Sequence, residues 1–122
     1  MRIGIIGSGM VGGTLGRCWV QRGHEVMFGV RDASNPKVGA LLAEAGPNAK
    51  AGTVAEAAAH GDVIVLATPW RATQDALRNA GNLTGKILLD CTNPLKADLS
   101  RLEVGHTTSG GEQVAAWAPR AW

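Results

Sequence analysis

The chain has 122 residues, of which 45% are hydrophobic and 18% are charged, and its formal net charge is +2 at pH 7. This length and composition are typical of one soluble globular domain, covering residues 1–122, that can bury a core of its own. Because the net charge is small, Lys and Arg form no runs and no apolar run approaches the ~18 residues of a membrane span, we expect neither nucleic acid nor a membrane as a partner.

A glycine-rich turn joins the first expected strand to the first expected helix. The apolar run Ile3–Ile6 is followed by Gly7-Ser8-Gly9-Met10-Val11-Gly12 and then by a helical pattern. A GxGxxG sequence between a strand and a helix is typical of a dinucleotide-binding turn, although a glycine-rich turn without a ligand is the alternative. In the first interpretation Gly7 permits the tight turn, Gly9 leaves room for a pyrophosphate, and Gly12 lets the helix approach the sheet. The free N–H groups at the helix N-terminus are expected to bind the phosphates.

The rest of the chain alternates between strands and helices. We expect strands over residues 25–30, 50–52, 62–67 and 86–90, and helices that begin near residues 36, 54, 70 and 110. Asn35 is expected to cap the second helix, and Thr53 with Glu56 forms a capping box for the third. This alternation predicts an α/β fold with a doubly wound parallel sheet, the Rossmann fold. A fingerprint on the first strand predicts the strand order 3-2-1-4-5.

The residues after the second strand indicate which dinucleotide binds. In such folds an acidic residue binds the ribose 2′-hydroxyl of NAD, whereas an Arg binds the 2′-phosphate of NADP. Arg31 lies nearest to this place, and Ser34 and Lys37 add donors for a phosphate, so the sequence predicts NADP(H). Asp32 leaves the binding of NAD open, because a shift of one residue would make it the ribose ligand. An Arg31–Asp32 pair on a solvated loop is the alternative without a ligand.

Two further loops follow the fourth and fifth expected strands. They contain Thr68-Pro69 and Thr92-Asn93-Pro94. Ligands on such sheets bind beyond the carboxyl ends of the strands, so we expect Thr68, Pro69 and Asn93 to line the cofactor site. The prolines fix the loop backbone, in either the trans or the cis form. Trp70 is either a core residue or a wall beside the nicotinamide.

No catalytic side chain and no metal site is predicted. Cys91 follows the fifth expected strand, but the sequence positions no base to activate it as a nucleophile. The three histidines are scattered. The chain opens without a secretion signal, so Cys18 and Cys91 are expected to be reduced thiols in a cytoplasmic protein. An oxidoreductase fits this pattern, because in hydride transfer the cofactor carries the chemistry.

Five segments form a linked set that spans essentially the whole chain: Gly7–Gly16, Gly29–Asp32, Gly61–Trp70, Gly85–Leu95 and Thr108–Glu112. The set resembles the NADPH-dependent reductases of the deazaflavin coenzyme F420. Related nucleotide domains occur in pyrroline-5-carboxylate reductase and in metalloreductases. The resemblance implies an NADP(H) domain that passes a hydride between the nicotinamide and a small-molecule acceptor or donor, a flavin or deazaflavin.

The resemblance also implies roles for individual residues. They are Ser8, Met10 and Val11 around the pyrophosphate, Arg31 at the 2′-phosphate, and Thr68 and Pro69 near the nicotinamide ribose. Val30 departs from the family pattern, because the family often has a Ser at this position. Without that Ser hydroxyl group the 2′-phosphate site has one hydrogen-bond donor fewer. Members of the family continue with a further strand and a small C-terminal domain over the ring, for which we expect no counterpart within residues 1–122. We therefore expect these residues alone to bind NADP(H) and to transfer hydride poorly.

A second function is compatible with the sequence. The chain would then be a dinucleotide-binding module that senses redox state or completes its site with a partner chain. In either case the strand over residues 86–90 would form an exposed apolar edge, and Trp117 and Trp122 would lack part of their cover. Such an edge favours self-association, so we expect a homo-oligomer.

Overall fold

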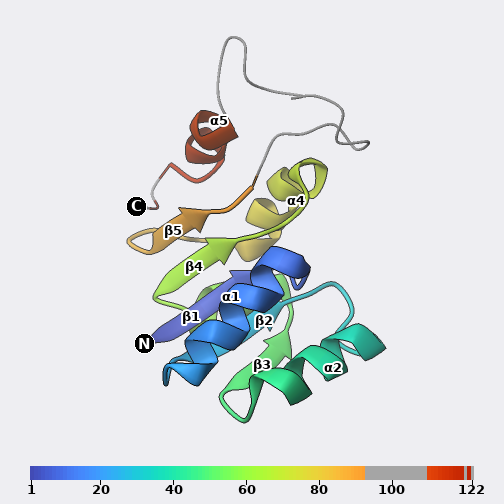
Figure 1. Ribbon diagram of the computed structural model, residues 1–122. Coiled ribbons are helices and arrows are strands. Elements are labelled where there is room, and N and C mark those ends of the chain that lie inside the picture. Colours follow the sequence, from blue (N-terminus) through green and yellow to red (C-terminus); the bar gives the residue numbers. More distant parts are fainter. Residues whose placement is uncertain (93–109, 120, 122) are drawn as a thin grey trace.

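A five-stranded parallel sheet runs through the centre of the computed structural model, which describes residues 1–92, 110–119 and 121 (Figure 1). Its strands are β1 (Arg2–Ile6), β2 (Glu25–Gly29), β3 (Ala49–Gly52), β4 (Val63–Leu66) and β5 (Ile87–Asp90). Their order is β3-β2-β1-β4-β5, and Ile5 of β1 is in register with Phe28 of β2 and Val65 of β4. The predicted doubly wound sheet and its strand order are confirmed.

The described helices are α1 (Met10–Gln21), α2 (Pro36–Ala45), α3 (Val54–His60), α4 (Trp70–Ala80) and α5 (Gly110–Trp117). α1 and α2 pack together on one face of the sheet, whereas α3 and α4 pack together on the other, with α5 against α4. This two-sided cover follows from right-handed crossovers that leave β1 in opposite directions. None of the described helices is long and apolar enough to cross a membrane.

The sheet separates two apolar clusters. Successive side chains of a strand point to opposite faces, so Ile5 and Ile6 of β1 belong to different clusters. The cluster under α1 and α2 contains Ile3, Ile5, Val20, Val26, Phe28, Ala45 and Val65. The cluster under α3, α4 and α5 contains Ile6, Ala58, Ile64, Leu66, Ala76, Leu77, Ala80, Leu83 and Val114. The central strands are buried on both faces, as their continuous apolar sequences predict.

The helix caps expected from the sequence are present. Asn35 caps α2, where its side-chain oxygen accepts a hydrogen bond from Lys37 N at 3.0 Å. Thr53 and Glu56 form the predicted capping box at α3. No described peptide bond is cis, so the trans alternative holds at Pro69. Asn93 and Pro94 lie outside the described residues, as does Ser109, which the sequence predicts as the N-cap residue of the helix that begins near residue 110.

Strand β5 forms one edge of the described sheet. The side of β5 that carries Leu88 packs against the cluster under α4 and α5. Ile87 and Leu89, on its other side, are 49% and 44% exposed. The predicted apolar edge is therefore confirmed, whereas the homo-oligomer expected from it stays a prediction.

Two glycines allow α1 to lie close to the sheet. A Cβ atom built on Gly12 would lie 2.8 Å from Gly7 O and 3.2 Å from Ile5 Cγ2. A Cβ atom on Gly16 would lie only 2.2 Å from Phe28 Cζ. Neither glycine has room for a side chain, because Gly7 O belongs to the turn and Ile5 and Phe28 belong to the core. The close approach expected at Gly12 is thus confirmed.

Replacing Gly16 by Ala tests this packing. We expect Gly16→Ala to lower the free energy of unfolding by about 1–3 kcal/mol, since an added methyl group in a filled core forces its neighbours apart. Gly39→Ala is the matched control, because Gly39 lies on exposed α2 with nothing within 4 Å of an added Cβ. The control should raise stability by about 0.5–1 kcal/mol. Urea denaturation measures the free energy of unfolding of the wild type and of both variants. A Gly16→Ala variant as stable as the wild type would contradict the close packing of α1 on the sheet.

Candidate functional site

A groove of about 600 Å³ opens at the carboxyl ends of β1, β2 and β4. Strand order reverses at β1, and ligands of open α/β sheets bind at such a switch point. Five residues predicted from the sequence line this groove, namely Gly7, Ser8, Arg31, Thr68 and Pro69. The remaining lining residues are Ile6, Gly29, Val30, Val54, Arg71, Ala72, Asp75, Ala76 and Asn79.

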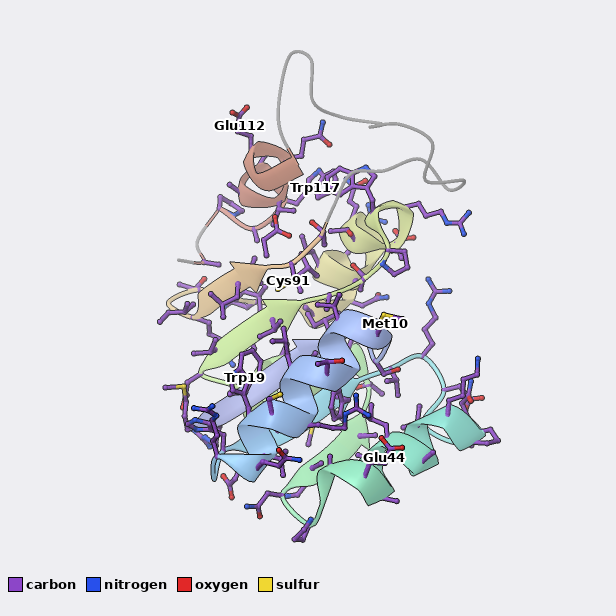
Figure 2. The ribbon with its side chains drawn as sticks, in the orientation of Figure 1. Met10, Trp19, Glu44, Cys91, Glu112 and Trp117 are labelled. Carbon is purple, nitrogen blue, oxygen red and sulfur yellow. The ribbon has the colours of Figure 1, made fainter. Side chains whose placement is uncertain are left out.

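A second hollow, of about 300 Å³, lies between α1 and α2 on the other side of the glycine turn. The predicted residues Gly9, Met10 and Lys37 line it. Ser8 lines both hollows, so the two meet at the turn. Figure 2 shows Met10 at the start of α1, beyond the ends of β1 and β4.

The other predicted site residues lie elsewhere. Gly12 is buried against the sheet, and Val11, beside it on α1, is 51% exposed. Ser34 lines neither hollow, and Asn93 lies outside the described residues. Contacts of any of the predicted residues with a cofactor stay predictions.

The backbone of the glycine turn forms a cradle suited to an anion. Gly7 has a φ of +109°, which favours glycine, and its N–H donates to Gly29 O at 3.1 Å. A Cβ atom on Gly9 would have nothing within 4 Å, so open space lies over the turn. Gly9 caps α1 without a side-chain hydrogen bond, and the first turn holds no acidic residue. The first N–H groups of α1 are thus available to a phosphate, as a pyrophosphate site requires.

Arg31 and Asp32, at the end of β2, have separate environments. Asp32 Oδ1 accepts hydrogen bonds from Ser34 Oγ at 2.5 Å and Ser34 N at 3.0 Å. These bonds hold the pKa of the Asp32 carboxyl below its ordinary value. Among the described residues no ion pair joins Arg31 to Asp32, and the alternative of a solvated loop without a ligand stays untested. The exposed Arg31 guanidinium is left available to a ligand.

The buried hydroxyl group of Thr73 determines whether Thr68 donates or accepts in the hydrogen bond between them. Thr73 is fully buried on α4 and donates its hydroxyl hydrogen to Pro69 O at 3.1 Å. Thr73 Oγ1 also lies 2.9 Å from Thr68 Oγ1. Because a hydroxyl group has only one hydrogen, Thr68 must be the donor in this pair. The lone pairs of Thr68 Oγ1 then remain as acceptors for a ligand hydroxyl group in the groove.

The polar residues of this region that sequence reasoning missed all lie on α4. Arg71, Asp75 and Asn79 line the groove, and Thr73 supports Thr68 from the core. The available signal was spacing, because positions i, i+4 and i+8 share one face of a helix. A helix that follows a strand end at the switch point presents that face to the site.

Trp70 and Cys91 take structural rather than chemical places. Trp70 packs on the cluster under α4, and its ring centroid lies 5.4 Å from that of Trp117, labelled on α5 in Figure 2. Trp70 does not line the groove, which favours the core alternative. Partial burial, together with the neighbouring Asp90, raises the pKa of the Cys91 thiol. The thiolate that a nucleophile requires is therefore disfavoured at Cys91.

Comparisons with known proteins agree with this geometry. The sequence profile described as "NADP oxidoreductase coenzyme F420-dependent" matches residues 2–94. A protein of Arthrobacter sp. FB24 assigned as an F420-dependent NADP reductase is 34% identical, with a TM-score of 0.88 over 99% of this chain and 60% of its own length. The chain therefore spans about three fifths of that relative.

Two other solved structures share the fold. A hypothetical protein of Sinorhizobium meliloti is 20% identical, with a TM-score of 0.85 over 99% of this chain and 58% of its own. An imine reductase of Myxococcus stipitatus, solved in complex with NADP+, is 25% identical. Its TM-score is 0.65 over 78% of this chain and 33% of its own.

The pair of threonines can be tested by a double-mutant cycle. We expect Thr68→Val and Thr73→Val each to weaken NADPH binding by about 0.5–1.5 kcal/mol, the net value of one hydrogen bond. Since Thr73 acts through Thr68, the double variant should bind no more weakly than Thr68→Val alone. Calorimetric titration of the wild type, the two single variants and the double variant with NADPH gives the coupling free energy between the two threonines. Fully additive losses would show that Thr73 does not position Thr68.

Proposed function

Since this chain belongs to the family of coenzyme F420-dependent NADP oxidoreductases, we propose that it binds NADP(H) and serves hydride transfer between the nicotinamide and a flavin or deazaflavin. The observation that carries this proposal is the juxtaposition of the glycine turn with Arg31 in one groove. An open turn at a helix N-terminus suits a pyrophosphate, and a guanidinium free of ion pairs suits a 2′-phosphate.

The proposal gives each part of the site a physical role. The N–H groups at the start of α1, with Ser8, would hold the pyrophosphate against the positive end of the helix dipole. Arg31 would bind the 2′-phosphate, and Lys37 would add positive charge from the neighbouring hollow. Thr68 would accept a hydrogen bond from a ribose hydroxyl group. These contacts fix the position of the cofactor along the carboxyl ends of the strands.

The side chains of the groove are suited to holding and orienting a ligand. When bound, the nicotinamide supplies the hydride chemistry, and protein groups position it. Ile6, Val54 and Ala76 give the groove apolar walls, which exclude water from a bound ring. Near-attack geometry between two rings contributes up to ~7–11 kcal/mol to such a reaction. Positioning is therefore the contribution expected from this chain.

The second substrate of the proposed reaction is a flavin or deazaflavin. The family description supports coenzyme F420 or a related flavin. The chain spans 60% of the Arthrobacter relative, so a function as a binding module completed by another segment or chain is the alternative. The exposed Ile87 and Leu89 on β5 support a second copy of the chain as that partner.

The cofactor preference gives the most direct test. We expect Arg31→Ala to weaken NADPH binding by about 1.5–3 kcal/mol, the scale of a charge-assisted hydrogen bond, and to change NADH binding little. Gly9→Val is a control that should abolish binding of both cofactors in a folded protein, because its side chain would fill the open space over the turn. Calorimetry measures the affinities of the wild-type chain and of both variants for NADPH and for NADH. Equal losses for the two cofactors in Arg31→Ala would point to the ribose and Asp32 instead.

The acceptor is tested by turnover. NADPH oxidation should be followed by absorbance with coenzyme F420, FMN and FAD, while light scattering gives the mass of the species. We expect coenzyme F420 to be the preferred acceptor and the turnover to be slow, because no described residue outside the nucleotide groove is assigned to a second ring. NADPH binding without turnover against any of the three would favour the binding module.

A further inference from the structure

The first turn of α4 contains a cation where a helix disfavours one. Arg71 is the second residue of α4, after Trp70 and the N-cap residue Pro69. The N-terminal end of a helix is the positive end of its dipole, where acidic side chains are favoured. The first turn of α4 nevertheless contains no acidic residue. An anion bound nearby would offset this unfavourable placement of the Arg71 charge.

No described residue neutralises Arg71. Asp75 lies one turn further along α4, at the spacing that favours an ion pair with Arg71. Instead, Asp75 Oδ1 accepts a hydrogen bond from Arg78 Nη1 at 3.2 Å. The described ion pairs leave both Arg71 and Arg31 without a carboxylate partner. The groove is thus lined by two guanidinium groups and one carboxylate, and that carboxylate is already paired.

The two arginines reach the groove from different elements. Arg31 belongs to the loop after β2, and Arg71 belongs to α4, which follows β4. Both elements leave the carboxyl edge of the parallel sheet (Figure 1). The same groove is also lined by Val54 and Ala72, apolar surfaces on which the flat face of a purine can lie. An adenosine bound there would share the groove with both arginines.

We propose that Arg71 is a specificity-determining residue that binds the adenosine 2′-phosphate together with Arg31. This inference rests on the proposed binding of NADP(H). A phosphate monoester carries close to two negative charges at neutral pH, so it matches two guanidinium groups better than one. The positive end of the α4 dipole acts in the same direction. NADH lacks this phosphate, so Arg71 selects NADPH over NADH.

The test uses probes that differ only in the 2′-phosphate. Affinities of the folded full chain for 2′,5′-ADP and 5′-AMP, and for NADPH and NADH, are measured by calorimetry. We expect Arg71→Ala to weaken 2′,5′-ADP and NADPH about 10-fold or more, the scale of a lost charge-assisted contact, with less than about a 2-fold change for 5′-AMP and NADH. Arg22→Ala is the matched control, because Arg22 is an exposed arginine that does not line the groove and belongs to none of the described ion pairs.

The outcomes separate this inference from the proposed function. Equal weakening of all four ligands in Arg71→Ala would place Arg71 at the shared adenine or 5′-phosphate and would overturn the assignment. Unchanged affinities, or an equal effect of Arg22→Ala, would overturn it as well. A wild-type chain that binds none of the four ligands would instead refute NADP(H) binding itself. Circular dichroism of the variants establishes that they are folded.

Discussion

The conformation of the turn between β1 and α1 determines what the rest of the molecule can hold. Gly7 takes a positive φ there, and a Cβ atom on it would lie 2.6 Å from Ala67 O. The turn therefore contacts the residues at the end of β4, and Gly12 of α1 lies beside Ala67. This contact brings a helix N-terminus, a strand end and a threonine hydroxyl group to one place. Anion binding at the start of α1 depends on this backbone geometry.

The two-sided core keeps this arrangement rigid. Ile5 and Ile6 send neighbouring side chains into different clusters, so β1 is held from both faces of the sheet. The close packing of such interiors leaves the strand ends little freedom to move. Arg31 and Thr68 therefore lie at one groove although 37 positions separate them in the sequence, because their strands are both paired with β1.

Local signals made most of the fold predictable. The GxGxxG turn, the cap at Asn35 and the capping box at Thr53 each depend on a few adjacent residues, and all three are found where expected. The β4 strand is one residue shorter at each end than the predicted strand over residues 62–67, since ladder pairing with β1 extends only from Val63 to Leu66.

The site was predictable only in part. Residues at strand ends could be placed, because the topology fixes where a parallel strand ends. Arg71 and Thr73 look like ordinary helix residues in the sequence, and their roles emerge only when α4 packs on the sheet. Ser34 does not line the groove, since its hydroxyl and amide groups donate to the Asp32 carboxylate two residues away, and its predicted contact with a phosphate stays a prediction.

The glycines of α1 also connect cofactor binding with the folding of the chain. Gly12, Gly13 and Gly16 each lower intrinsic helicity by about 1 kcal/mol relative to alanine, so an isolated α1 segment would be mostly unfolded. Its helical structure depends on contact with Phe28 and Ile5, which come from two strands. The phosphate cradle therefore exists only in the native state, and any ligand that occupies it shifts the folding equilibrium toward that state. If the proposed NADP(H) binding holds, cofactor supply would determine in part how long the chain survives unfolding and proteolysis.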